Sequence, residues 1–152
     1  MIKIIVDANV VAKWFLKEEY NKEAKYLRDL YINRKISLIA PIHLVAEVCN
    51  AIWKAFKIGK VITYETALLL LREFPKLYPI LICPDSNILS SAFEISEEFG
   101  ITIYDSLYIA LLKLHFGELF VTADIKLYDK IKDMKGVIYL PNIMIELNKY
   151  IK

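Results

Sequence analysis

Four acidic residues stand out because each interrupts a segment that is otherwise apolar. Asp7 ends the apolar run in IIVDAN, Glu47 is the one acidic residue in segment 42–56, Asp105 lies in IYDSLYIALL, and Asp124 lies in LFVTADIK. If these carboxylates meet in one pocket, their mutual repulsion has to be relieved by a cation. Oxygen ligands without a histidine or cysteine set favour a hard cation, Mg²⁺ or Mn²⁺. Such a cation with open water positions is suited to phosphodiester hydrolysis.

Taken singly, each of these acids also has an ordinary structural interpretation. Asp7, Asp105 and Asp124 are each placed to cap a helix or to stabilise its first turn. Glu47 lies on a narrow polar stripe with Lys54, which fits a solvated residue or half of an ion pair. The metal-site hypothesis therefore depends on the four side chains converging, and the elements that carry them have to bring this about.

Short apolar segments alternate with amphipathic segments along the whole chain. Strands are predicted at 2–6, 37–40, 80–83, 119–121 and 137–139, and helices at 9–16, 21–33, 42–56, 63–74, 87–99, 104–115, 125–132 and 142–150. Asn21 is the expected N-cap of the second helix. The alternation predicts an α/β fold in three layers, with a mostly parallel central sheet of four to five strands flanked by helices. The length of 152 residues suits a single domain, 1–152.

The positions of two acids follow from a rule for parallel sheets, whose sites lie outside the carboxyl ends of the strands. Asp7 directly follows the first strand, and Asp124 follows the strand at 119–121 by a short step. Both are therefore expected at the same edge of the sheet. Glu47 and Asp105 lie on helices with otherwise apolar faces, so they need a polar pocket to face.

The charge balance permits a nucleic-acid partner without indicating one, because the formal net charge is only +2. Lys13, Lys54, Lys57 and Lys60 are candidates for bordering the acidic pocket and holding phosphates, although such lysines are more often simply solvated. No apolar run approaches the roughly 18 residues of a membrane span. The N-terminus also lacks a signal-peptide pattern, so we expect a soluble, cytoplasmic protein with no membrane partner.

The cysteines and the large aromatic residues give weaker indications. Cys49 and Cys83 lie far apart without a CxxC pattern, which suits small buried residues in a reducing compartment. The early helices carry an unusual number of large aromatic residues: Trp14, Phe15, Tyr20, Trp53 and Phe56. They fit either core packing or an exposed groove for a partner helix.

In order and separation, the four acids resemble those of the PIN-domain nucleases, and especially the VapC-type toxins of toxin–antitoxin pairs. The segments that carry the resemblance are VDANVVAKWF, PIHLVAEVCNAIWK, IYDSLYIALL and LFVTADIKLYDKI. They run from the first strand to near the C-terminus, and only the ordered set is specific. The resemblance implies that Asp7, Glu47, Asp105 and Asp124 are the catalytic, metal-binding acids.

The resemblance extends to several neighbouring polar residues. Asn9 and Thr122 match residues that in this family orient the carboxylates or bind metal-linked water. Ser106 follows the third acid, as it does in many members, and is a weaker candidate. His43 is outside the family's metal set and is expected to be a structural or rim residue, although HxxxE at helical spacing is able to bind a metal.

The resemblance implies an Mg²⁺- or Mn²⁺-dependent endoribonuclease that leaves a 5′-phosphate and a 3′-hydroxyl. It also implies a homodimer and a cognate antitoxin protein that blocks the site, as in a type II toxin–antitoxin system. Two alternatives keep the same fold: a housekeeping RNA-processing nuclease and a non-catalytic RNA- or partner-binding module. An aspartate-based phosphotransferase with Asp7 as nucleophile is disfavoured, because such enzymes usually carry a second acid where Asn9 stands.

Overall fold

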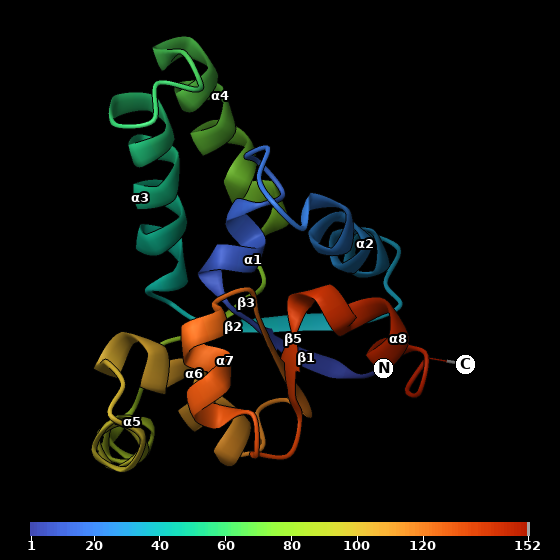
Figure 1. The fold of residues 1–152 in the computed structure, drawn as a ribbon, viewed down its shortest axis with the longest axis vertical. Helices are drawn as coiled ribbons and strands as arrows, with labels where there is room; N and C mark the ends of the chain where they lie inside the picture. Colours follow the sequence, from blue (N-terminus) through green and yellow to red (C-terminus); the bar gives the residue numbers. More distant parts are fainter. Residues whose placement is uncertain (152) are drawn as a thin grey trace.

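The computed structural model describes residues 1–151 and builds them around one parallel sheet (Figure 1). Its strands are β1 Lys3–Val6, β2 Ser37–Pro41, β3 Ile80–Ile82, β4 Leu119–Thr122 and β5 Val137–Tyr139. They lie in the order β3-β2-β1-β4-β5, and every adjacent pair is parallel. The inner strands are almost wholly apolar, as expected for strands covered on both faces.

Helices cover both faces of the sheet and complete the predicted three-layer fold. The helices in the described residues are α1 Ala8–Ala12, α2 Asn21–Ile32, α3 Leu44–Lys57, α4 Tyr64–Glu73, α5 Ser86–Phe99, α6 Ile103–Lys113, α7 Ile125–Ile131 and α8 Ile143–Leu147, with short 3-10 helices η1 Phe74–Leu77 and η2 Leu140–Asn142. Helices α1, α2 and α8 lie on one side of the sheet, and α5, α6 and α7 on the other (Figure 1). Helix α6 packs directly on β1, β2 and β4, and its residues from Ser106 to Leu112 are all buried.

The strand order creates a switch point between β1 and β4. From β1 the chain passes to β2 on one side, and it later returns to place β4 on the other. The register pairs Val6 with Val121, and the backbone N–H of Asp7 donates to the Val121 carbonyl at 3.0 Å. Asp7 and Thr122 therefore leave the sheet side by side, at the kind of position where α/β sheets bind ligands.

Helices α3 and α4 form an arm, the α3–α4 arm, that extends away from the sheet at one end of the molecule (Figure 1). The base of α3 packs against α1, directly after β1. Glu47 lies near this base, in the first turn of α3. The arm thus brings the helix acid toward the edge of the sheet that carries Asp7.

Two helices differ from their predicted extents. The helix predicted at 9–16 ends at Ala12, and an irregular loop follows. Asn21 is not the N-cap of α2: that position is taken by Tyr20, with a φ of 61°. The Asn21 side chain instead accepts from the Glu18 N–H at 3.1 Å and donates to the Leu16 carbonyl at 2.9 Å, because the loop's backbone groups need partners. The predicted helix at 142–150 shortens to η2 and α8.

Two further sequence expectations can be compared with the structure. Both cysteines are free thiols, but only Cys49 is partly buried, and the expectation of a buried residue is wrong for Cys83. Cys83 is exposed because it follows β3, the edge strand of the sheet. Within residues 1–151, no helix combines the length and hydropathy that a membrane span requires.

A glycine between α7 and β5 yields a prediction about stability. Gly136 has a φ of +90°, and a Cβ there would lie 2.7 Å from the Glu118 carbonyl oxygen. We expect Gly136→Ala to lower the free energy of unfolding by about 2 kcal/mol or more, since both the backbone and the contact would be strained. Urea denaturation measures this change.

Gly59→Ala is the matched control, because its nearest neighbour would be 3.5 Å away. We expect the stability of this variant to stay within about 0.5 kcal/mol of the parent. Equal stabilities for Gly136→Ala and the parent protein would contradict the proposed constraint at the β4–β5 junction.

Candidate active site

Asp7 is held by a small polar network at the ends of β1 and β4. Its Oδ2 accepts hydrogen bonds from the Thr122 hydroxyl at 2.7 Å and from the Asn9 amide at 3.1 Å. Asn9 Oδ1 in turn accepts from the Ala123 N–H at 3.0 Å. Asp7 occupies the N-cap position of α1, but its side chain makes no capping hydrogen bond, so the cap interpretation of Asp7 is wrong.

The carboxyl of Asp7 has an unusual proton affinity for an aspartate. Burial raises the pKa of Asp7 to about 7; the hydrogen bond from Thr122 opposes this rise, and the negative charges of Glu47 and Asp105 add to it. The last two contributions mean that Glu47 and Asp105 lie within electrostatic reach of Asp7.

The Glu47 side chain points toward α6 and not along the polar stripe of α3 that contains Lys54. Its Oε1 accepts a hydrogen bond from the Tyr108 hydroxyl at 2.8 Å and lies 3.1 Å from His43 Nε2. These partners, and not Lys54, fix the side chain, so the interpretation as a solvated residue or an ion pair with Lys54 is wrong. The buried Tyr108 hydroxyl has a raised pKa, chiefly because of burial and then because of the charges of Asp7 and Glu47.

Asp105 lies in the first turn of α6, which Thr102 caps by accepting the Asp105 N–H at 3.2 Å. Burial raises the pKa of Asp105, and the charges of Asp124 and Glu47 raise it further, while Thr102 and His43 act in the opposite direction. Asp105 therefore interacts electrostatically with Glu47 on α3 and with Asp124, which follows β4. This coupling fits the predicted convergence of the acids.

Asp124 does cap a helix, as the structural interpretation allows. Its Oδ1 accepts from the N–H groups of Lys126 at 2.9 Å and Leu127 at 3.2 Å, at the start of α7. Only one carboxylate oxygen makes these bonds. Asp124 also lines a cavity of about 160 Å³ together with Asp105, so its capping role and a role in the acidic pocket are compatible.

Two lysines that sequence reasoning missed border this acidic cavity. Lys126 and Lys130 line it from α7, one helical turn apart, and Lys130 Nζ donates to the Gly100 carbonyl at 2.9 Å. Their spacing of two and six residues after Asp124 is the signal that was available in the sequence. Both lysines are exposed and are placed to meet a negatively charged chain.

The lysines named from the sequence lie elsewhere or are already paired. Lys13 forms an ion pair with Glu18 at 3.1 Å. Lys57 and Lys60 line a separate hollow with Phe56, near the turn between α3 and α4. The expectation that these lysines border the acids is therefore wrong for Lys57 and Lys60. The reason is that Lys57 ends α3 and Lys60 lies in the turn that follows, whereas Glu47 lies in the first turn of α3.

Two polar residues near the acids have structural partners. Ser106 is fully buried, and its hydroxyl is 2.6 Å from the Ser96 hydroxyl, which joins α5 to α6. His43 Nε2 lies 3.0 Å from the Tyr104 carbonyl as well as near Glu47. Ser106 therefore serves packing, and His43 supports Glu47 from the rim, as expected for a residue outside the metal set.

The carboxylate oxygens of the four acids are the groups that could bind a metal at this site. No three His, Cys, Asp or Glu side chains among residues 1–151 lie close enough together to enclose an ion by themselves. Mg²⁺ is commonly held by one or two carboxylates and retains several waters. The oxygen-only set fits such a hard, partly hydrated cation, and so does Asp7, whose pKa is raised by burial and then by neighbouring negative charge.

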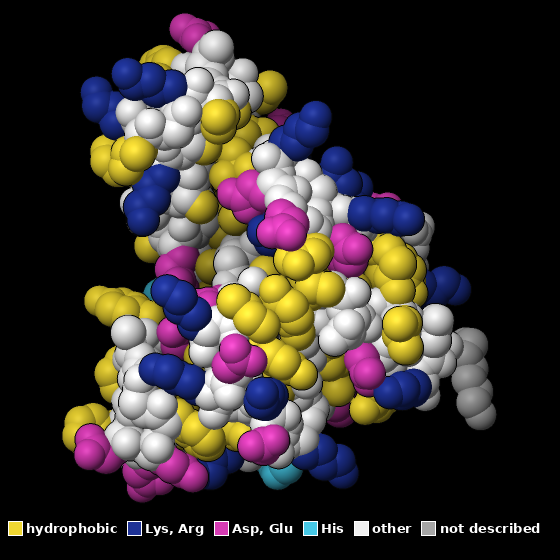
Figure 2. Space-filling model, in the orientation of Figure 1, with side chains coloured by type: hydrophobic (Ala, Val, Ile, Leu, Met, Phe, Trp, Pro, Cys, Tyr) yellow, Lys and Arg dark blue, Asp and Glu magenta, His cyan; other side chains and the backbone are white. Residues whose placement is uncertain are grey.

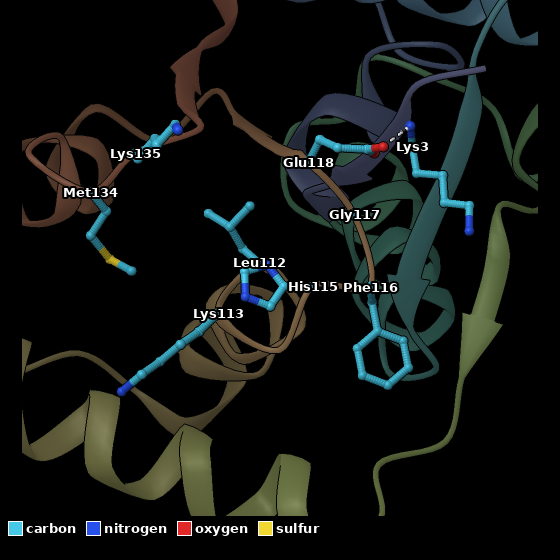
Figure 3. Close-up of a pocket in the computed structure, with 9 residues that line it drawn as sticks. All are labelled: Lys3, Leu112, Lys113, His115, Phe116, Gly117, Glu118, Met134 and Lys135. Carbon is cyan, nitrogen blue, oxygen red and sulfur yellow. Dashed lines mark hydrogen bonds between the residues drawn. The ribbon is translucent and has the colours of Figure 1, made fainter.

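The surface view agrees with this placement. Acidic side chains, a histidine and basic side chains gather where the α3–α4 arm meets the helices below it (Figure 2). A larger cavity, of about 560 Å³, lies at the opposite edge of the sheet, near the starts of β1 and β4 (Figure 3). The acid lining that cavity, Glu118, accepts from the Lys3 N–H at 2.8 Å, so the larger cavity does not hold the acidic cluster.

The comparisons with known proteins agree with the fold. Ribonuclease VapC3 of Pyrobaculum aerophilum is 28% identical in an alignment 134 residues long that covers 85% of this chain and 95% of that protein. The crystal structure of PAE2754 from Pyrobaculum aerophilum has a TM-score of 0.69 at 23% identity, covering 97% of this chain and 96% of the other. A toxin–antitoxin complex from Klebsiella pneumoniae has a TM-score of 0.58 at 14% identity, with coverage of 90% and 97%. Residues 4–133 match the PIN domain family, and because this match spans most of the sequence, the chain belongs to that family.

Proposed function

We propose that this protein is a metal-dependent endoribonuclease and the toxin component of a type II toxin–antitoxin system. The observation that carries the proposal is the buried Asp7 carboxyl, whose pKa near 7 reflects burial and the added charges of Glu47 and Asp105. A packed protein gains nothing in stability from such a group. Asp7 lies at the β1–β4 switch point, where α/β sheets bind ligands. Hydrolysis of RNA is further supported by the name of the curated relative, which is a ribonuclease.

The protein's own residues divide the work of cleavage. Thr122 and Asn9 fix the orientation of the Asp7 carboxylate, and the N-terminal amides of α7 fix that of Asp124. Lys126 and Lys130 attract the phosphate backbone to the edge of the pocket. A bound Mg²⁺ or Mn²⁺ supplies Lewis acidity that activates water and stabilises charge on the scissile phosphate. Cleavage on this pattern leaves a 5′-phosphate and a 3′-hydroxyl.

The α3–α4 arm provides surface for a protein partner. Its exposed apolar side chains are Trp53, Ile58, Val61, Tyr64 and Leu69. These side chains are available to a protein partner, and the neighbour in a toxin–antitoxin complex makes an antitoxin the fitting partner. A homodimer is proposed with it, and a protein with these partners would act on RNA in the cytoplasm.

Some of the large aromatic residues of the early helices pack in the core, and others are exposed to a possible partner helix. Trp14 is a core residue whose Nε1 donates to the Ala24 carbonyl at 3.0 Å. Phe15 packs edge-on against Phe74, while Trp53 is 51% exposed on the arm. Core packing thus explains Trp14 and much of Phe15, and Trp53 remains available to a partner.

The two alternative functions, a non-catalytic binding module and a housekeeping RNA-processing nuclease, predict different properties for the same fold. A non-catalytic binding module has no use for a buried acid destabilised by its neighbours. A housekeeping RNA-processing nuclease would share the chemistry and differ in its cellular effect. Expression of the chain would arrest growth for a toxin, and co-expression of a small adjacent gene product would restore it.

The acids are tested by isosteric substitution. We expect Asp7→Asn and Asp105→Asn each to reduce RNA cleavage by more than about 100-fold, the upper range for residues that only support a metal ligand. Asp85→Asn is the control, since Asp85 caps α5 by accepting the Ile88 N–H at 2.9 Å and asparagine is an equally good cap. Parent-like cleavage by both pocket variants would remove the proposed mechanism.

Metal removal, and the pH dependence of metal binding, test whether the site binds a cation. We expect a chelator to stop cleavage and Mg²⁺ or Mn²⁺ to restore it. Because Asp7 has a pKa of about 7, its proton competes with the cation below that pH. Titration calorimetry should therefore show Mn²⁺ affinity rising between pH 6 and 8. Affinity that is independent of pH, or hydrolysis that persists in chelator, would count against this site.

The raised pKa also predicts a stability change in the metal-free protein. The folded pKa of Asp7, about 7, lies above the ordinary aspartate value of 3.8, so the carboxyl ionises at a lower pH in the unfolded chain than in the folded protein. The fold consequently loses stability as pH rises from 4 to 7 and stays at that lower level above 7. Metal-free Asp7→Asn should unfold at a higher temperature than the parent at pH 8, and the advantage should vanish near pH 4. An advantage that is equal at both pH values would show that Asp7 ionisation is not the cause.

A further inference from the structure

Glu47 has the longest side chain of the four acids and needs the most restraint. Its side chain is 35% accessible to solvent, so water is an available alternative to the acidic pocket. Fixing a glutamate in one rotamer costs on the order of 1.5 to 2 kcal/mol of conformational entropy. Specific partners are needed to hold it in place, and the structure provides two.

Both partners meet the same oxygen atom of Glu47. The Tyr108 hydroxyl donates to Oε1 at 2.8 Å, and His43 Nε2 lies 3.1 Å from Oε1. Tyr108 belongs to α6, and His43 precedes α3 by one residue, so the contacts join two separate elements. The second oxygen, Oε2, takes no part in either contact.

Tyr108 is a rigid donor. It is 0% exposed, and its ring centroid lies 5.9 Å from that of Phe120 on β4. The His43 ring packs edge-on against it at 5.2 Å. A buried tyrosine hydroxyl requires a hydrogen-bond partner, and here that partner is Glu47. The hydroxyl cannot leave Glu47 without disturbing the packing between α6 and the sheet.

His43 provides a second, weaker restraint. Its Nε2 faces two acceptors, Glu47 Oε1 and the Tyr104 carbonyl oxygen at 3.0 Å, so Nε2 carries a hydrogen and serves as the donor. Its Nδ1 is buried without a hydrogen-bond partner within residues 1–151. The ring is therefore tied to the rim through Nε2, and this leaves that nitrogen unsuited to bind a metal.

A similar arrangement occurs at Asp7 and Asp124. Asp7 is held through Oδ2 by Thr122 and Asn9, and Asp124 is held through Oδ1 by amides of α7. Glu47, Asp7 and Asp124 are thus each held by protein donors at one carboxylate oxygen. Supporting groups of this kind orient metal ligands and commonly change metal affinity when they are removed.

We propose that Tyr108, assisted by His43, is a positioning residue that anchors Glu47 by Oε1 and thereby reserves Oε2 for the acidic pocket. This inference rests on the proposed function of that pocket. Tyr108 does not touch the substrate in this role; it acts through Glu47. Its removal should therefore weaken cation binding before it affects the fold.

The test is Tyr108→Phe, which deletes the hydroxyl and keeps the ring. Mn²⁺ binding is measured by electron paramagnetic resonance and by calorimetry, with RNA cleavage and thermal unfolding in parallel. We expect Mn²⁺ affinity to fall by about 10-fold, within the range for supporting residues. The control is Tyr31→Phe, which deletes a hydroxyl that donates to the Tyr78 carbonyl at 2.6 Å, far from the acids. It should lose similar stability and keep its Mn²⁺ affinity within about 2-fold.

A double-mutant cycle separates positioning from general damage. In a Glu47→Gln background, Tyr108→Phe should cause little further loss of Mn²⁺ affinity, because its effect passes through that carboxylate. If Tyr108→Phe does not fold, His43→Phe removes the second donor and keeps an aromatic ring, and a smaller loss of affinity is expected.

The outcomes distinguish this inference from the proposed function. If the parent binds Mn²⁺ and cleaves RNA, and Tyr108→Phe binds Mn²⁺ equally well, the positioning role is wrong and the nuclease stands. A full additional loss in the Glu47→Gln background would also overturn the role. If the parent neither binds Mn²⁺ nor cleaves RNA, the proposed function fails, and the positioning role fails with it.

Discussion

The carboxyl group of Asp7 is buried at the switch point of the sheet, with the charges of two other acids nearby. The remaining residues of the site have to stabilise its ionised form. Burial alone disfavours the ionised form, and like charges add to the cost. Thr122 and Asn9 offset part of this cost by hydrogen bonding to one oxygen. These hydrogen bonds orient the Asp7 carboxyl without neutralising its charge, and the proposed cation would neutralise it.

The fold brings the acids together from parts of the chain that are far apart. The parallel register of β1 and β4 sets Asp7 beside Thr122. The base of the α3–α4 arm carries Glu47 to the same edge, and α6, packed across three strands, carries Asp105. Asp7 and Asp124 lie directly beside the ends of strands, and Glu47 and Asp105 lie in the first turns of helices, so the backbone of each acid is held by regular structure.

Much of this arrangement could be predicted from the sequence, for identifiable physical reasons. Buried parallel strands are nearly continuous apolar runs, so β1 and β4 were evident, and the strand-end rule placed Asp7 and Asp124 correctly. Side-chain partners could not be predicted in the same way. Nothing in HLVAE indicated that Glu47 would turn toward Tyr108, sixty-one positions away in the chain. Irregular segments were also missed, since Asn21 serves a loop whose path depends on tertiary packing.

The central claim is that the acidic edge of the sheet binds one or more hard dications. Anomalous diffraction from crystals soaked in Mn²⁺ tests it most directly, because the method locates the ion without assuming its ligands. The account predicts a peak beside the Asp7 carboxylate, within coordination distance of at least one more of the acids Glu47, Asp105 and Asp124. Manganese bound only elsewhere on a protein that still cleaves RNA would contradict it.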